Sequence, residues 1–238
     1  MTPSKIILIR HGESQGNGDK RVYLNTPDHR IELTPKGREQ ARAAGAKLDE
    51  MIGTSSVLAS IRPLGTASVQ FMCSTHRRSR QTLDELVSGW KRSFNVGYDP
   101  RLREQEWTGS FGKDIGAIKA IQEERYRYGT FHYRFPNGES GADVYMRMDS
   151  FIGALWRDFR KPDYPENLVI VGHGFLNRMF LARWFHWSPD YFETVDSPEN
   201  CGMYVLDQAA QGGGYTLNTA LDFDPKIARV DDHFGFHK

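Results

Sequence analysis

Two histidines stand directly after apolar runs that end in the same way. The run IILI is followed by Arg10-His11-Gly12, and the run LVIV is followed by Gly172-His173-Gly174. A third apolar run ends at Cys73 and leads into the basic residues Arg77 and Arg78. Arginine can donate two parallel hydrogen bonds to phosphate oxygens, and histidine can act as a base or a nucleophile near neutral pH. Together these residues predict a site for a phosphoryl group.

Other well-known chemistries are excluded by counting residues. A cysteine phosphatase needs arginine six positions after the cysteine, but Ser79 stands there after Cys73. A P-loop needs a second glycine five positions after the first, but Asn17 occupies that place after Gly12. The sequence has no HExxH segment, which excludes a zinc hydrolase built on that helix.

Composition limits the class of protein. The chain has 238 residues, 39% of them hydrophobic, with 31 Lys+Arg against 30 Asp+Glu and a formal net charge of +1. This balance offers no bulk attraction to nucleic acid or to an anionic membrane, so we expect neither as a partner. The length suits a single domain over residues 1–238 with a sizeable core, and the oligomeric state is not predicted.

The cellular location is predicted from the lengths of the apolar runs and from the cysteines. The first apolar run has four residues, too few for a secretory signal, which needs roughly 7–15. No run approaches the roughly 18–20 apolar residues of a membrane span. Only two cysteines occur, Cys73 and Cys201, and neither has a metal-ligand spacing. We therefore expect a cytoplasmic protein in a reducing compartment.

Strand-like and helix-like patterns alternate along the chain. Helices are expected to begin at Thr34-Pro35 and, through a capping box, at Ser140. The other expected helices span about 77–90 and 175–185, and the expected strands span 5–10, 67–73, 94–98, 168–171, 203–206 and 215–218. The segments 54–66 and 208–214 are candidate insertions. This order predicts the α/β class, a three-layer αβα sandwich with a mostly parallel central sheet.

In such a sheet, ligands bind beyond the carboxyl ends of the strands. His11, His173 and the basic residues near Arg78 each follow a predicted strand. We therefore expect them to meet at one edge of the sheet.

The pattern resembles the histidine phosphatase superfamily, also called phosphoglycerate mutase-like. The resemblance begins with Arg10-His11-Gly12-Glu13-Ser14 and Asn17, and continues with Leu33-Thr34, Gly37 and Gln40. The segment from Ser74 to Thr82 resembles the family's SPLxRAxQT, with Thr75 and His76 in place of Pro and Leu. The family's acid-bearing segment is resembled by Leu102-Arg103-Glu104 with Gly109. Within the family, the chain is most similar to small plant and fungal members regarded as broad-range phosphatases, through its segments LREQEW and FPNGES.

The resemblance implies a phosphoglycerate mutase-like fold and a role for each matching residue. His11 would be the nucleophile that becomes phosphorylated. Arg10, Asn17, Arg78 and His173 would hold the phosphoryl oxygens, with help from the backbone N–H of Gly174. Glu104 would donate a proton to the leaving oxygen, although Glu106 lies close enough in the sequence to be an alternative. No metal and no other cofactor would be needed.

The implied function is hydrolysis of a small-molecule phosphomonoester through a phosphohistidine, with release of inorganic phosphate. Broad specificity is one option. A cofactor-dependent phosphoglycerate mutase is the first alternative, but the chain reads LREQEWTG and HGFL where family mutases have LNERHYG and HGNS. The second alternative is an inactive phosphate-binding or scaffold domain, although the chain retains every residue of the phosphate pocket.

Residues that would contact the rest of the substrate are left open. Basic residues flank the motifs and are either substrate contacts or solvated helix ends: Arg21, Arg30, Arg125, Arg127, His132 and Arg134. Glu139 is a candidate ion-pair partner for Arg10 or Arg78.

Overall fold

The computed structural model describes residues 2–53, 68–107, 115–209 and 214–219, which build one central sheet. Its strand order is β3-β2-β4-β1-β5-β6. The strands are β1 (Lys5–Arg10), β2 (Val69–Ser74), β3 (Phe94–Asp99), β4 (Asn167–Gly172), β5 (Met203–Gln208) and β6 (Tyr215–Leu217). The first four are parallel to one another, and β5 and β6 are antiparallel to their neighbours.

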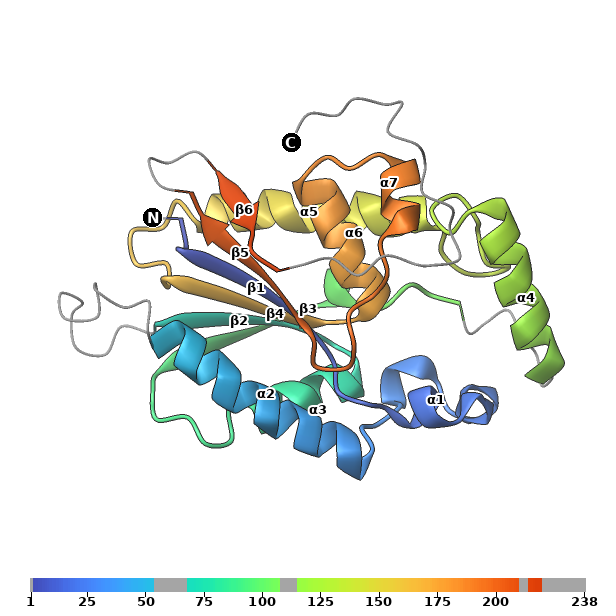
Figure 1. Ribbon diagram of the computed structural model, residues 1–238, viewed down its shortest axis with the longest axis horizontal. Helices are drawn as coiled ribbons and strands as arrows, with labels where there is room; N and C mark the ends of the chain where they lie inside the picture. The colour runs from blue at the N-terminus through green and yellow to red at the C-terminus, as the bar shows by residue number, and fades with distance from the viewer. Residues whose placement is uncertain (1, 54–67, 108–114, 210–213, 220–238) are drawn as a thin grey trace.

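Helices cover both faces of this sheet (Figure 1). The α-helices are α1 (Gln15–Gly18), α2 (Pro35–Gly53), α3 (Arg77–Leu86), α4 (Ile115–Tyr128), α5 (Gly141–Asp158), α6 (Gly174–Trp184) and α7 (Pro189–Thr194). In the view of Figure 1, α2 and α3 lie below the sheet, while α5 and α6 lie above it. This is the three-layer αβα sandwich with a mostly parallel sheet that the sequence predicts.

The apolar runs of β1 and β4 supply both layers of the core. Ile6 and Leu8 belong to the cluster that includes the buried faces of α5 and α6. Ile7 and Ile9 point the other way, into the cluster that includes α2 and α3. Because successive side chains of a strand alternate between its faces, a continuous apolar run marks a strand buried on both sides. The uninterrupted runs IILI and LVIV therefore determined which strands lie at the centre.

Most predicted elements are confirmed, with small shifts at their ends. The capping box of Ser140 is present, with its side chain accepting from the backbone N–H of Asp143. The helix expected over 77–90 ends earlier, at Leu86, because Ser88 and Trp90 bond back to carbonyl oxygens in a turn. The helices α1, α4 and α7 were not predicted from the sequence. The segment 54–66 lies outside the described residues, as do 210–213 in the second candidate insertion.

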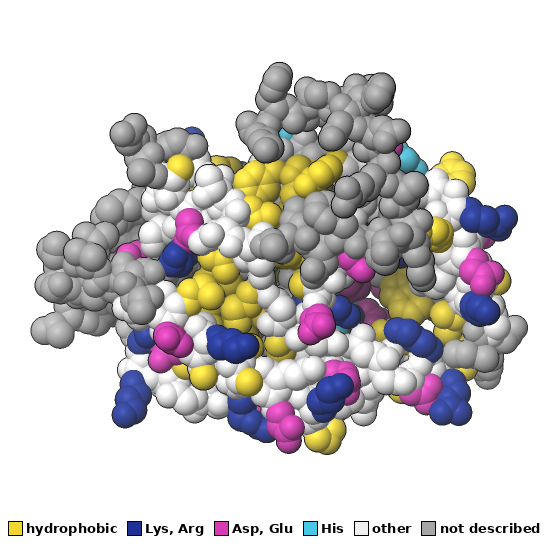
Figure 2. Space-filling model, viewed as in Figure 1, with side chains coloured by type: hydrophobic (Ala, Val, Ile, Leu, Met, Phe, Trp, Pro, Cys, Tyr) yellow, Lys and Arg dark blue, Asp and Glu magenta, His cyan; other side chains and the backbone are white. Residues whose placement is uncertain are grey.

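Charges of both signs are spread over the face of the molecule seen in Figure 2, in keeping with a net charge of +1. Across the described ranges, no helix is both long and apolar enough to cross a membrane.

Candidate functional site

The parallel strands bring the sequence motifs to one edge of the sheet. β1 and β4 are neighbours and end together, since Arg10 is paired with Gly172. The backbone N–H of His11 donates to the carbonyl oxygen of Gly172 at 2.9 Å. The ring centroids of His11 and His173 are consequently only 5.2 Å apart, although 162 positions separate them in the sequence.

The His11 ring is held in one tautomer. Its Nδ1 lies 2.7 Å from the carbonyl oxygen of Gly12, which can only accept, so Nδ1 carries the proton. Nε2 then presents a lone pair and accepts from Nε of Arg78 at 3.2 Å. Burial and the neighbouring Arg78 lower the pKa of His11 well below its usual value. The buried ring therefore stays neutral, the state in which Nε2 can act as a nucleophile.

Arg78 is fixed by a carboxylate that the sequence analysis did not single out. Its guanidinium donates to both side-chain oxygens of Asp28, at 2.8 and 3.2 Å, and to the Asp28 carbonyl oxygen at 2.8 Å. Arg78 and Asp28 are 2% and 6% exposed, so this charge pair is desolvated. A bidentate pair defines the direction of the guanidinium plane, and here it points Nε at His11.

His173 is also oriented by a hydroxyl from another strand. Its Nε2 lies 2.8 Å from Oγ of Ser74 at the end of β2. Ser74 Oγ accepts from the backbone N–H of His76 and can donate its own proton to His173 Nε2. In that arrangement the neutral ring carries its proton on Nδ1, which has no hydrogen-bond partner within the described part of the chain. That N–H is a donor available to a ligand.

Arg10, Gly174 and Asn17 complete the same edge. Arg10 is anchored by donating to the carbonyl oxygen of Pro198 at 2.6 Å. A Cβ added to Gly174, the first residue of α6, would lie 3.4 Å from Nε of Arg10, so the two residues are adjacent. Asn17 accepts through Oδ1 from the backbone N–H of Ser14 at 3.0 Å. This arrangement leaves the Asn17 amide N–H₂ group as a potential donor.

Glu104, one of the two candidate acids, lies in the electrostatic environment of the site. Burial raises the pKa of Glu104, and the nearby Arg78 partly opposes that rise. Burial lowers the pKa of Arg10, and Glu104 partly opposes that change, which places its carboxylate near both arginines. Glu106 is instead tied to Glu139 through its backbone N–H, at 3.0 Å. A carboxyl whose pKa is raised can hold the proton that a leaving group needs.

The ion-pair partner suggested for Glu139 is wrong. Glu139 binds Arg103 at 2.5 Å and Arg147 at 3.0 Å, rather than Arg10 or Arg78. Arg147 in turn donates to the carbonyl oxygens of Arg103 and Glu104. Glu139 and Arg147 therefore hold the backbone that carries Glu104. No periodic or motif signal along the chain indicates this contact.

Several motif residues shape the loop after β1. A Cβ on Gly12 would lie 2.3 Å from the carbonyl oxygen of Gly37, closer than real Cβ atoms approach. The N–H of Gly12 donates to Oγ1 of Thr82, and the N–H of Glu13 donates to Oε1 of Gln40. These contacts press the loop against α2 and α3 and so determine where His11 lies. Gly109, which the family pattern included, is outside the described residues.

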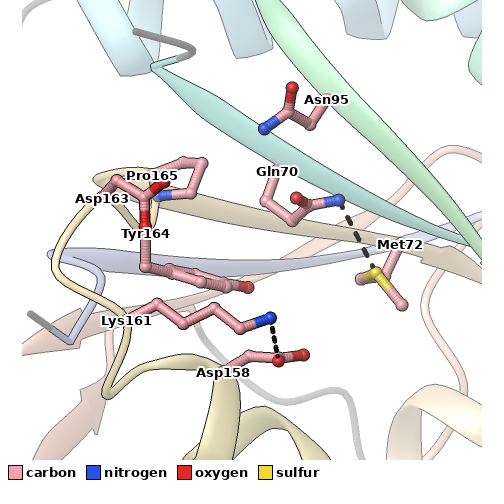
Figure 3. Close-up of a pocket in the computed structure, with 8 residues that line it drawn as sticks. All are labelled: Gln70, Met72, Asn95, Asp158, Lys161, Asp163, Tyr164 and Pro165. Atoms are coloured by element: carbon pink, nitrogen blue, oxygen red, sulfur yellow. Dashed lines mark hydrogen bonds and ion pairs between the residues drawn. The ribbon is translucent and has the colours of Figure 1, made fainter.

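A separate cavity of about 330 Å³ opens at the opposite end of the sheet (Figure 3). It is lined by Gln70 and Asn95 near the beginnings of β2 and β3, and by the segment that leads into β4. Lys161 in this cavity pairs with Asp158 at 2.7 Å. None of the motif residues lines it, so the cavity is distinct from the edge where the histidines meet. The described residues form no cluster of three or more His, Cys, Asp or Glu side chains that could hold a metal ion.

Comparison with known proteins defines the class. The family model of the histidine phosphatase superfamily (branch 1) matches residues 6–219. The chain therefore belongs to the histidine phosphatase superfamily, as the resemblance of its motifs predicts.

Two individual relatives agree with this assignment. The chain is 43% identical over 225 residues to phosphoglycerate mutase-like protein AT74H of Arabidopsis thaliana, covering 89% of this chain and 76% of that protein. It is 31% identical over 301 residues to broad-range acid phosphatase DET1 of Saccharomyces cerevisiae, covering 92% and 90%.

The fold is shared with two solved structures. Mycobacterial hydrolase 1 matches with a TM-score of 0.66 and 22% identity, over 93% of this chain and 100% of that one. YhfR of Bacillus stearothermophilus matches with a TM-score of 0.65 and 21% identity, over 90% and 95%.

Proposed function

We propose that this protein is a phosphomonoester hydrolase that works through a phosphohistidine on His11. The observation that carries the proposal is the hydrogen bond from Nδ1 of His11 to the carbonyl oxygen of Gly12, which leaves the nucleophilic lone pair on Nε2. Nε2 attacks phosphorus, and the bond from phosphorus to the alcohol oxygen breaks. Water then attacks the phosphohistidine, the N–P bond breaks, and inorganic phosphate leaves.

Glu104 is proposed to move the protons in both steps. Its raised pKa favours the protonated carboxyl, which can give its proton to the departing alcohol oxygen. The resulting carboxylate then takes a proton from the attacking water and so returns to its starting state. General acid–base help of this kind contributes roughly 10²–10⁴ in rate.

The phosphoryl oxygens are proposed to be held by fixed donors. These are Arg10, Asn17, Arg78, Nδ1–H of His173 and the backbone N–H of Gly174. Preorganised donors act on the charge that develops in the transition state, and removing one of them typically costs about 10²–10³ in rate. Because the arginines supply the positive charge, we propose that the reaction needs no metal ion. We also propose that the substrate is a small-molecule phosphomonoester.

The test is hydrolysis of 4-nitrophenyl phosphate in EDTA, with and without orthovanadate. We expect release of 4-nitrophenol by the wild type, inhibition by vanadate, and no turnover by His11→Asn. His186→Asn is the matched control, because His186 is exposed and has a positive φ of 56°, which asparagine tolerates. Retained activity in His11→Asn, with vanadate still inhibiting, would exclude His11 as the nucleophile.

The family also contains mutases, and two relatives of this chain are named phosphoglycerate mutase-like. A mutase would return the phosphoryl group to the bound product instead of passing it to water. The assay for this alternative is isomerisation of phosphoglycerate with a bisphosphate primer. Isomerisation faster than phosphate release would favour a mutase. Phosphate binding without turnover in either assay would favour a non-catalytic domain.

A cytoplasmic location stays a prediction that rests on the cysteine content.

A further inference from the structure

His76 stands where the family motif has leucine, and its ring contacts two parts of the candidate site. It lies edge-to-face against His173, with 4.9 Å between the ring centroids. Its Nδ1 also lies 3.4 Å from Oδ2 of Asp28. His76 is 6% exposed and is not one of the donors proposed to hold the phosphoryl oxygens. Burying a polar ring in place of an apolar side chain costs free energy unless the ring has a partner.

The contact between His76 and Asp28 is incomplete. The distance of 3.4 Å is longer than a good N–H···O hydrogen bond, and Nδ1 has no hydrogen-bond partner among the residues that the structure describes. In the neutral ring with its proton on Nε2, a lone pair on Nδ1 faces the carboxylate. A proton on Nδ1 would donate to Oδ2, and this bond is strongest when the ring is charged. The two groups are therefore placed for an ion pair that the neutral ring does not form.

Asp28 connects this ring to the arginine that lies against the proposed nucleophile. Both carboxylate oxygens of Asp28 accept from Arg78, whose Nε donates to His11. Oδ2, the oxygen that faces His76, has the longer of the two bonds, 3.2 Å against 2.8 Å for Oδ1. A proton on His76 would therefore act on the carboxylate that directs Arg78.

A bound phosphoryl group changes the charge around His76. In its dianionic form it brings two negative charges to the edge of the sheet where the carboxylate of Asp28 is already buried. Like charges that lie close together in a buried site repel, and a proton on a neighbouring base relieves that repulsion. His76 contacts both Asp28 and His173, a proposed phosphoryl ligand, so it is the base between the two negative groups.

The surroundings of His76 hold its ring neutral until such a charge arrives. Burial lowers the pKa of His76 to about 4, and nearby cations lower it further, whereas Asp28 raises it. The charged and titratable groups that act on this ring come from several segments: Arg78 on its own helix, Asp28 and His29 of the 3₁₀ helix Asp28–Arg30, Arg103, His11 and His173. An added negative charge opposes the cations and shifts the ring towards its protonated form.

Building on the proposed phosphoryl site, we propose that His76 takes up a proton when a phosphoryl dianion binds, and that its imidazolium then pairs with Asp28 to hold Arg78 in place. The proton comes from solvent, so that both ring nitrogens carry one, and it returns to solvent when inorganic phosphate leaves. His76 is thus a positioning residue that acts through Asp28. A leucine at this position has no such response.

The test measures proton uptake with tungstate, a tetrahedral dianion that stays unprotonated between pH 6.0 and 7.5. Titration calorimetry in two buffers of different ionisation enthalpy gives the number of protons taken up per tungstate bound. At pH 6.0 we expect the wild type to take up about 0.3–1 proton more than His76→Leu. Between pH 7.5 and 6.0 the Kd of the wild type should tighten about three- to thirtyfold more than that of the variant, because each proton contributes a factor of about ten per pH unit.

A second variant separates the proton from the packing. His76→Gln keeps an amide that can donate to Asp28 but does not titrate, so it should lack the extra proton and keep the Kd at pH 7.5 within about threefold of the wild type. His29→Asn is the matched control, because it removes an exposed histidine beside the same carboxylate and should keep the uptake. Uptake by Glu104 is common to all these proteins and cancels in the comparison.

A spectroscopic measurement on the wild type does not depend on the folding of any variant. The ring signals of His76, assigned through the backbone in NMR spectra, should move towards those of imidazolium when tungstate is added at pH 6.0. Unmoved signals, or equal uptake and equal pH dependence in wild type, His76→Leu and His76→Gln, would refute the role of His76.

Failure of the hydrolase function has a different signature. If the wild type shows His76-dependent uptake but does not hydrolyse 4-nitrophenyl phosphate, the hydrolase function is refuted and the role of His76 stands. If the wild type does not bind tungstate at all, the phosphoryl site is refuted, and the role of His76 with it.

Discussion

Three buried histidines surround the candidate site, and we predict that they make the fold sensitive to acid. His11, His76 and His173 are 5%, 6% and 0% exposed. Burial lowers the pKa of all three, and the nearby Arg78 lowers each further. For His76 the pKa falls to about 4, although Asp28 partly opposes the change.

The sign and size of this pH effect on the free energy of unfolding follow from proton binding. Above pH about 6.5, the usual pKa of histidine, both the folded and the unfolded chain hold a neutral His76, so pH has no effect through this group. As the pH falls from about 6.5 towards 4, the unfolded chain takes up a proton that the folded chain does not, so stability is lost. Between pH 7 and 5 the loss through His76 alone is about 2 kcal/mol. His11 and His173 act in the same direction.

The assay is urea unfolding, followed by tryptophan fluorescence at pH 7, 6 and 5. The informative variant is His76→Leu, which removes one titrating ring and restores the residue that the family motif has there. Its free energy of unfolding should fall by about 2 kcal/mol less than that of the wild type between pH 7 and 5. His186→Asn, at an exposed histidine, is the control and should follow the wild type. An identical pH dependence in His76→Leu and wild type would refute the burial argument.

Three further predictions concern the site. Glu104→Gln should lower kcat for glycerol 3-phosphate by about 10²–10⁴, and should lower kcat for 4-nitrophenyl phosphate less, because 4-nitrophenolate needs little help from a proton to leave. Glu106→Gln should change kcat little for either substrate, and the opposite ranking of the two variants would reassign the acid. Gly12→Ala should cost at least about 1–3 kcal/mol of stability in urea unfolding, because its Cβ would lie 2.3 Å from a carbonyl oxygen at the start of α2. Asp28→Asn should weaken vanadate inhibition and lower the free energy of unfolding by about 1.5–3 kcal/mol, because Arg78 loses a charged acceptor. An unchanged inhibition constant for vanadate would contradict this role of Asp28.

The class of fold could be determined from the sequence because its signals are local. The unbroken apolar runs at β1 and β4 are typical of strands buried on both faces, and Thr34-Pro35 and Ser140 indicate helix starts. Once parallel strands were predicted, the positions of His11 and His173 followed, because the carboxyl ends of neighbouring parallel strands meet at one edge. Among the side chains of the missed helix α4 whose burial is described, only Ile118 is a strongly buried apolar residue, so this part of the chain carries little helical periodicity.

The partners of the site residues were decided by the tertiary structure alone. Asp28 binds Arg78 from 50 positions away, and Ser74 bonds His173 from 99 positions away. The sequence named Glu104 by its motif, but only the packing around it shows that burial raises its pKa. Contacts between segments so distant in the chain leave no spacing or periodic pattern that can be read along it. The sequence thus determined which residues could do the chemistry, and the packing of the folded chain determined their tautomer, charge and direction.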